Sequence, residues 1–202
     1  MSPDIQRRIE RKHILEAKIT YFEKPGKENT EVVMDIVKNR AQELGITTVV
    51  SASMRGYTAE RAIKVLEGLK LIFVGGYYNP TTASLTESFS PEYEKLIKGK
   101  ATLLVATHLF AGLSATMRKK FSNAIEGEIV ASTLRMFGAG IKVGIECAVM
   151  AADAGLVRTD EDVIAIGGTR SGADSAIVLR PVNSQDFFDL KVKEILCKPR
   201  EW

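Results

Sequence analysis

Residues 46–76, with the sequence ITTVVSASMRGYTAERAIKVLEGLKLIFVGG, decide the fold class of this chain. The β-branched run Thr47 to Ser51 predicts a strand, and Leu71 to Val74 predicts the next one. Between them, apolar residues recur at the spacing of an amphipathic helix, namely Ala59, Ala62, Ile63, Val65, Leu66 and Leu69. A strand, a helix and a second strand in this order are typical of a parallel βαβ unit.

The same alternation continues on both sides of this segment. Further strands are predicted at Ile19 to Phe22, Ala101 to Thr107, Val163 to Ile166, Ser175 to Leu179 and Asp189 to Leu196. Helical spacing covers Val32 to Leu44, Pro91 to Ile97, Met117 to Phe121, Glu128 to Phe137 and Ile141 to Ala154. We therefore expect an α/β fold.

The composition is that of one folded domain. The chain has 202 residues, of which 45% are hydrophobic and 26% charged, and its net charge is +3. A chain of this length can bury a substantial core, and its composition is far from a disordered one. The charge is too small to indicate a polyanionic partner by itself. We expect one domain over residues 18–202, preceded by a basic helical extension over residues 1–17.

The N-terminal extension and the most apolar stretch of the chain indicate the cellular compartment. The extension carries four scattered cations, Arg7, Arg8, Arg11 and Lys12, which are more typical of a solvated helix face than of a nucleic-acid site. Its first residues lack the apolar core of a signal peptide. The most apolar stretch, Ile141 to Leu156, contains charged residues and is too short to span a bilayer. We expect a cytoplasmic protein that contacts neither membrane nor nucleic acid.

The loop after the strand at Thr47 to Ser51 is a candidate phosphate site. Ligands of open parallel sheets bind beyond the carboxyl ends of the strands, where helix N-termini also favour anions. This loop offers hydroxyls, a guanidinium and a glycine there, from Ser51, Ser53, Arg55, Gly56 and Thr58. The alternative is an ordinary turn in which Ser53 or Thr58 caps the next helix.

The glycine-rich run from Gly167 to Asp174 is a second candidate. It lies between two predicted strands, so it differs from a dinucleotide-binding motif, in which a helix follows directly. Arg170, Ser171 and the glycine amides could hold an anion, which favours a binding role. The alternative is a long βα-type turn or a hairpin turn that needs glycine for positive φ.

The sequence shows no catalytic or metal-binding constellation. His108 follows a strand and is expected at the same edge of the sheet, yet no serine or carboxylate can be assigned to it from spacing. Lys142, Glu146 and Asp153 lie on one stripe of an apolar helix, which indicates a narrow solvent edge or, alternatively, an edge facing a ligand. The segment Gly75 to Pro91 is too long for a simple turn and predicts a flap or a mobile loop.

Several segments together resemble a known family. Residues 53–59, Ser-Met-Arg-Gly-Tyr-Thr-Ala, resemble the Thr-x-Ser-Gly-x-Thr-Ala stretch of pyruvate kinase C-terminal domains. Residues 21–30, 145–153 and 167–174 resemble a prokaryotic family of stand-alone relatives of that domain. The resemblance covers residues 18 onward. It implies a three-layer α/β/α fold, with a mostly parallel sheet and one antiparallel strand.

The resemblance also implies a ligand and a partner. Stand-alone members are associated with flavin mononucleotide (FMN), and pyruvate kinase subunits contact each other through this domain, which implies a homo-oligomer. Carried over, Ser53, Gly56 and Thr58 would hold the phosphate, although Arg55 stands where the kinase motif has serine. The other walls would come from Asn29, Thr30, His108, Gly168, Thr169, Arg170, Ser171, Gly172 and Asp174.

Three functions follow as hypotheses. The first is binding of a phosphorylated small molecule, with FMN as the expected ligand. The second is a flavin-dependent oxidoreductase of unknown substrate, and the third is a regulatory or assembly subunit. Pyruvate kinase activity itself is not expected, because a catalytic barrel takes about 250 residues and no such segment is present.

Overall fold

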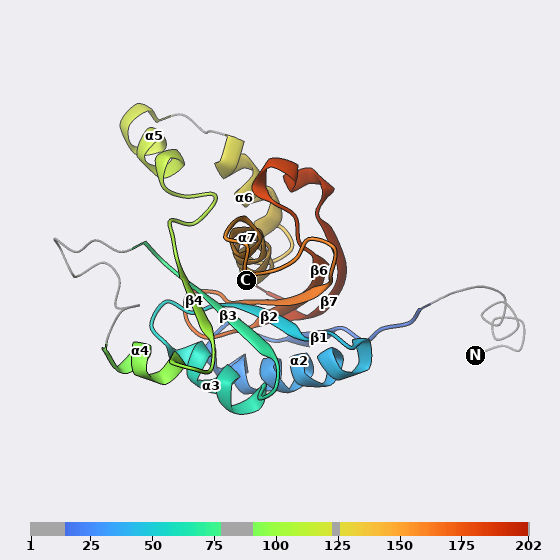
Figure 1. Cartoon of the computed structure of the whole chain (residues 1–202). Helices are drawn as coiled ribbons and strands as arrows, with labels where there is room; N and C mark the ends of the chain where they lie inside the picture. The colour runs from blue at the N-terminus through green and yellow to red at the C-terminus, as the bar shows by residue number, and fades with distance from the viewer. Residues whose placement is uncertain (1–14, 78–90, 123–125, 202) are drawn as a thin grey trace, which may run out of the picture.

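The computed structural model describes residues 15–77, 91–122 and 126–201. Its centre is a sheet with the strand order β1-β7-β6-β5-β2-β3-β4 (Figure 1). The strands are β1 Thr20–Phe22, β2 Thr48–Ala52, β3 Lys70–Gly75, β4 Thr102–Val105, β5 Val163–Gly167, β6 Ser175–Arg180 and β7 Lys191–Pro199. All neighbours pair in parallel except those of β6, which runs antiparallel to both β5 and β7. The expected mostly parallel sheet with one antiparallel strand is confirmed.

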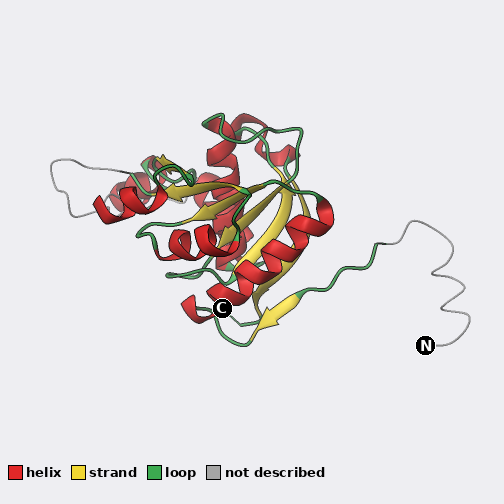
Figure 2. Ribbon diagram, turned by 60° about the horizontal axis from the view of Figure 1, so that its bottom comes forward, coloured by secondary structure: helices red, strands yellow, loops and turns green. Residues whose placement is uncertain are grey.

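Helices cover both faces of this sheet (Figures 1 and 2). One face carries α2 Thr30–Leu44, α3 Tyr57–Val65 and α4 Pro91–Ile97, and the other carries α6 Glu126–Arg135 and α7 Ala139–Asp153. Helix α5 Leu113–Phe121 lies on the side of α6 and α7, farther from the sheet. Two short 3₁₀ helices, η1 Lys27–Asn29 and η3 Ser184–Asp189, complete the described elements. The three-layer α/β/α architecture is therefore confirmed.

Two hydrophobic clusters lie on opposite faces of the sheet because side chains alternate along each strand. On β2, Val49 belongs to the cluster under α2 and α3, whereas Val50 belongs to the cluster under α7. Helix α2 buries one face with Val33, Val37 and neighbouring residues, and Gly45 ends it in the left-handed conformation at φ 66°. Helix α7 is buried over most of its length, so it is the central helix of its layer.

Some of the sequence-based expectations fall outside the described residues, and the start of the last strand differs from its expected position. Residues 15–19 are irregular, and residues 1–14 of the expected basic helix lie outside the described residues. Most of the expected flap, residues 78–90, lies outside them as well. The last strand begins at Lys191 rather than Asp189, because η3 occupies residues 184–189. Within the described ranges, no helix is long and apolar enough to cross a membrane.

Candidate functional site

The two candidate loops follow neighbouring strands. Strand β2 pairs in parallel with β5, with Ser51 opposite Ile166, so both strands end at the same edge of the sheet. From this edge the chain leaves β2 towards α3 and β3 on one side, and leaves β5 towards β6 on the other. Such a divergence is a topological switch point, where open α/β sheets form a crevice for ligands. The fold therefore places residues 53–56 and 168–174 side by side at this switch point, which we call the β2/β5 edge.

The loop after β2 starts α3 with a cap. The Ser53 hydroxyl accepts a hydrogen bond from the Ala59 amide at 3.3 Å, so Ser53 caps the helix as the alternative interpretation predicted. Gly56 has φ 86°, and a Cβ there would lie 3.0 Å from the buried Tyr93 ring. Both the conformation and the contact require glycine at this position.

The remaining candidates of this loop differ in exposure. Ser51 is fully buried and donates to the Ala52 carbonyl at 3.3 Å, and Thr58 is also buried. Arg55 is exposed beside them. Within the described part of the chain, the amides of Tyr57 and Thr58 have no hydrogen-bond partner. The backbone of the first turn of α3, rather than its hydroxyls, is thus available to an anion.

The glycine-rich loop is a hairpin connection held by Asp174. The buried Asp174 carboxylate accepts hydrogen bonds from the amides of Thr169 at 3.0 Å and Gly26 at 3.3 Å, and from the Ser175 hydroxyl at 2.9 Å. Arg170 adopts φ 73° at the turn. Asp174 therefore shapes the loop and ties it to the segment before α2, while the exposed Arg170 and Ser171 stay at the surface.

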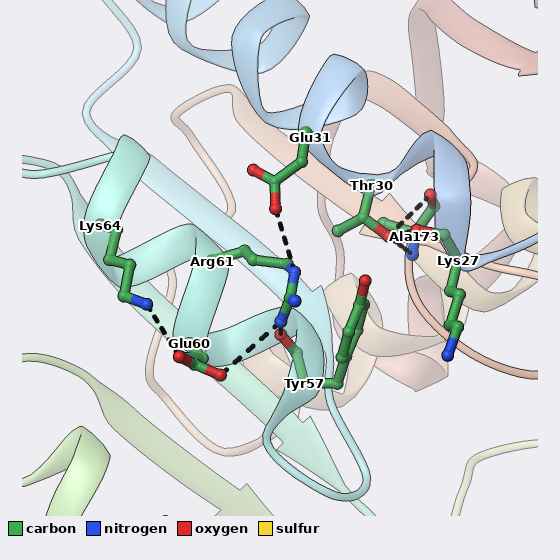
Figure 3. A network of polar contacts seen from close by, with 8 residues as sticks. All are labelled: Lys27, Thr30, Glu31, Tyr57, Glu60, Arg61, Lys64 and Ala173. Atoms are coloured by element: carbon green, nitrogen blue, oxygen red, sulfur yellow. Dashed lines mark hydrogen bonds and ion pairs between the residues drawn. The ribbon is translucent and has the colours of Figure 1, made fainter.

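The start of α2 packs against the same loop. The buried Thr30 hydroxyl accepts from the Ala173 amide at 3.0 Å and donates to the Lys27 carbonyl at 2.5 Å (Figure 3). Gly172 has φ 74°, and a Cβ there would lie 2.6 Å from the Thr30 hydroxyl oxygen. Asn29 donates to the Lys24 carbonyl at 2.9 Å. Asn29 and Thr30 thus hold the loops in place and bring the α2 N-terminus to the β2/β5 edge.

Tyr57 connects the N-termini of α2 and α3. The Arg61 guanidinium carbon lies 3.5 Å from the Tyr57 ring centroid, and the Lys27 ammonium lies 5.8 Å from it (Figure 3). Arg61 also forms an ion pair with Glu31 of α2 at 3.0 Å. The Tyr57 ring therefore lies between two cations, next to the N-termini of α2 and α3.

His108 contacts helix α7. It follows β4, which β3 separates from β2, and its partner Glu146 lies on α7, whose first turn packs on Gly167 and Asp174. Its Nδ1 lies 3.2 Å from Glu146 Oε2, and Lys142 Nζ lies 2.5 Å from the same oxygen. The Phe110 amide donates to Glu146 Oε1 at 3.0 Å. We call Lys142, Glu146 and His108 the α7 cluster.

This cluster corrects the prediction of a solvent edge on α7. Lys142 is 8% and Glu146 1% exposed, so neither is on a solvated face; Asp153 alone of the stripe is exposed. The i,i+4 spacing of Lys142 and Glu146 could have indicated their pairing, whereas the link to His108 depends on tertiary structure. Burial alone would raise the pKa of Glu146, but hydrogen bonds from His108 and Lys142 lower it to about 2.

The possible metal ligands and the cysteines of the described residues do not form a reactive group. They contain no group of three His, Cys, Asp or Glu side chains able to hold a metal ion. Cys147 and Cys197 are both buried, and burial raises the pKa of the Cys197 thiol to about 12. The β2/β5 edge presents backbone amides and exposed cations, which are groups of the kind that contact anions in proteins.

The fold is that of an α/β domain with a topological switch point between β2 and β5. Residues 31–179 match the model of the family described as pyruvate kinase, alpha/beta domain. The chain belongs to the pyruvate kinase alpha/beta domain family.

Solved structures give a weaker likeness. A pyruvate kinase from Cryptosporidium parvum superimposes with a TM-score of 0.39 and 12% identity, covering 75% of this chain and 22% of that one. A second structure of pyruvate kinase from that organism gives a TM-score of 0.37 at the same identity and coverages. A structure of the enzyme in complex with ADP gives 0.35 at 12% identity, covering 74% and 22%. The chain thus spans about a fifth of the length of these enzymes.

Proposed function

We propose that the chain binds a phosphorylated small molecule at the β2/β5 edge, with FMN as the expected ligand, and that it has no pyruvate kinase activity. The observation that carries the proposal is the convergence of two loops and two helix N-termini at one switch point. The unpartnered amides of Tyr57 and Thr58, within the described residues, supply donors for phosphate oxygens. Both candidate loops from the sequence analysis, the one after β2 and the glycine-rich one, lie at this edge.

The charges at the edge fit an anionic ligand. Lys27, Arg55 and Arg170 are exposed there, on three segments that are distant in sequence. The exposed acids nearby include Glu31, which forms an ion pair with Arg61. Guanidinium groups recognise phosphate with charge-assisted hydrogen bonds. Ser171 lies between the loop glycines and supplies a further hydroxyl at the surface.

The flavin part of the proposal rests on the family resemblance and on Tyr57. Its ring lies at the mouth of the edge, where an aromatic ligand could pack beside it. FMN, when bound, would supply electron transfer, which is the basis of the alternative proposal of an oxidoreductase. The residues of the edge would hold the phosphate and orient the ring.

The binding test compares FMN with riboflavin, which has the same ring system and lacks the phosphate. We expect FMN to bind the wild-type chain more tightly than riboflavin, as measured by quenching of flavin fluorescence. Arg170→Ala and Arg55→Ala are expected to weaken FMN binding about tenfold each, the effect of losing one charge-assisted contact. Lys38→Ala removes an exposed cation from the far half of α2 and serves as the control. Equal affinities for the two flavins would contradict a phosphate site.

A second proposal concerns self-association. Helix α5 has nine residues and buries none of them, and its apolar side chains Leu113, Met117 and Phe121 recur at a spacing of four. Leu113 is 75% exposed and Phe121 53% exposed. A helix this short is marginal unless its apolar face packs on something. We propose that a second copy of the chain covers this face in a homo-oligomer, the assembly expected from the family resemblance.

The association test replaces an apolar residue of α5 with a charged one. Met117→Glu is expected to convert the oligomer to monomer, because it places a charge at the centre of the apolar face. Light scattering after size-exclusion chromatography measures the mass directly. Val32→Glu changes an exposed apolar residue on α2 and is the matched control. A wild-type monomer at high concentration would contradict the proposal.

A further inference from the structure

The α7 cluster is a polar centre inside an apolar layer. Helix α7 is apolar along most of its buried surface, yet it places an ammonium and a carboxylate there, at positions 142 and 146. Burying charges is costly unless they are paired and hydrogen-bonded. The cluster lies across the sheet from α2 and α3, and the start of α7, at Gly140, packs on Gly167 and Asp174 of the glycine-rich loop.

Both carboxylate oxygens of Glu146 have hydrogen-bond partners. One oxygen contacts Lys142 Nζ at 2.5 Å and His108 Nδ1 at 3.2 Å, and the other accepts from the Phe110 amide at 3.0 Å. Because the carboxylate stays ionised, it can accept hydrogen bonds but not donate them. We therefore assign the His108 proton to Nδ1, which leaves the lone pair on Nε2.

Lys142 and His108 keep unused capacity. The Lys142 ammonium has three N–H groups, and the described residues offer it one oxygen acceptor, Glu146, and the face of the Phe110 ring at 5.2 Å. His108 Nε2 has no hydrogen-bond partner among the described residues. The His108 side chain is 24% exposed, so a small molecule can reach it. Both residues contact the same oxygen, Glu146 Oε2, so one spare donor and one spare acceptor lie close together beside the carboxylate.

A purely structural clamp would not need the imidazole. Lys142 neutralises the buried Glu146, and the Phe110 amide holds the loop after β4 against α7. The cluster adds an imidazole whose outer nitrogen is unpartnered in the described residues. The arrangement of an imidazole oriented at Nδ1 by a carboxylate is that of a general acid–base residue.

We propose that the α7 cluster binds a small hydroxy acid, whose carboxylate accepts from Lys142 and whose hydroxyl donates to His108 Nε2. In this site the ligand hydroxyl donates a hydrogen bond to His108 Nε2 while the Nδ1–H group stays on Glu146, so the site binds the ligand without breaking a bond. His108 touches the ligand, and Glu146 is a positioning residue. The proposal does not depend on the phosphate site.

The composition of the chain makes this site easy to observe. It contains two histidines, and the other is His13 in the N-terminal segment. The variant His13→Gln leaves one imidazole, so ¹⁵N NMR of histidine-labelled protein reports on His108 alone. The resonances of Nδ1 and Nε2 distinguish the two neutral tautomers. We expect the free protein to show a protonated Nδ1 and an unprotonated Nε2.

Ligand binding is tested with glycolate, a two-carbon hydroxy acid, and with acetate, which lacks its hydroxyl. We expect glycolate to shift the His108 Nε2 resonance in a saturable way at constant ionic strength, and acetate to shift it far less. Equal responses to the two anions, no response to glycolate, or a proton on Nε2 in the free protein would each overturn the proposal. These readouts need no substitution in the cluster itself.

The role of Glu146 is tested with Glu146→Gln in the same His13→Gln background. A neutral amide no longer fixes the proton on Nδ1, so we expect a mixture of tautomers and a weaker response to glycolate. The amide spectrum of the backbone reports whether the variant is folded. If it is unfolded, Lys142→Gln is used instead, and it is expected to keep the tautomer and lose the glycolate response. A folded Glu146→Gln variant that binds glycolate like its parent would contradict the positioning role.

Discussion

The two polar regions of this domain are built by different means. The β2/β5 edge consists of backbone amides, small residues and exposed cations, and its conformation depends on glycines and on capping side chains such as Ser53 and Thr30. The α7 cluster consists of three ionisable side chains, two of them buried in an apolar layer. The first region buries one carboxylate, Asp174, among backbone amides, whereas the second buries an ion pair. Their responses to mutation should therefore differ in size and in kind.

The largest effect is expected at the α7 cluster. Glu146→Ala leaves the Lys142 charge buried without its carboxylate, which should cost about 3–5 kcal/mol of unfolding free energy. Urea denaturation measures the loss. The double variant Lys142→Met/Glu146→Leu removes both charges and should recover most of the stability, because apolar side chains of similar size can replace a buried ion pair. A double variant less stable than Glu146→Ala would show that the charges themselves are required.

Acid should act mainly on the same cluster. The folded pKa of Glu146 is about 2, below its ordinary value of 4.5, so its ionised form stabilises the folded chain above that ordinary value. This contribution should be lost as the pH falls from about 4.5 towards 2. Urea denaturation at several pH values measures it, and in the Lys142→Met/Glu146→Leu variant this part of the acid dependence should be absent. An unchanged acid dependence in that variant would assign the loss to other carboxylates.

A smaller effect is expected at the β2/β5 edge. Gly172→Ala adds a Cβ that collides with the Lys27 backbone and with Thr30, in addition to the strain of positive φ. We expect a loss of about 2–3 kcal/mol. Gly155→Ala is the matched control, because Gly155 has φ 68° and open space around it, and should cost about 1 kcal/mol. Equal losses for the two variants would show that the close packing of the loop on α2 contributes little.

The same contrast explains what the sequence could predict. Alternating strand and helix patterns predicted the α/β class. The end of α2 was also predictable, because Gly45 directly follows the last apolar residue of the helical pattern. The two loops of the β2/β5 edge were found because each is continuous in sequence and rich in glycine and hydroxyl residues. Their position on neighbouring strands required the strand order, since β5 follows β2 by more than 100 residues.

The α7 cluster could not be predicted in the same way. His108 and Glu146 are 38 residues apart, and no local pattern links a residue after a strand to the middle of a distant helix. The polar stripe on α7 was noticed, but a solvated face is the ordinary explanation of such a stripe. The structure shows instead that two of its members are paired inside the protein. Side-chain networks between distant elements need three-dimensional information.

The hydrogen bond from the Gly26 amide to Asp174 has a consequence for the order of folding. It joins residues that are 148 positions apart, so the loop before α2 and the glycine-rich loop cannot stabilise each other until both halves of the chain are in place. Closing so long a loop is entropically costly, and contacts of this range generally form late. On the ribosome, the early strands and α2 would leave the exit tunnel long before Asp174. The β2/β5 edge, where we propose that the ligand binds, should therefore be among the last parts to become ordered, and binding there would report that the whole domain is complete.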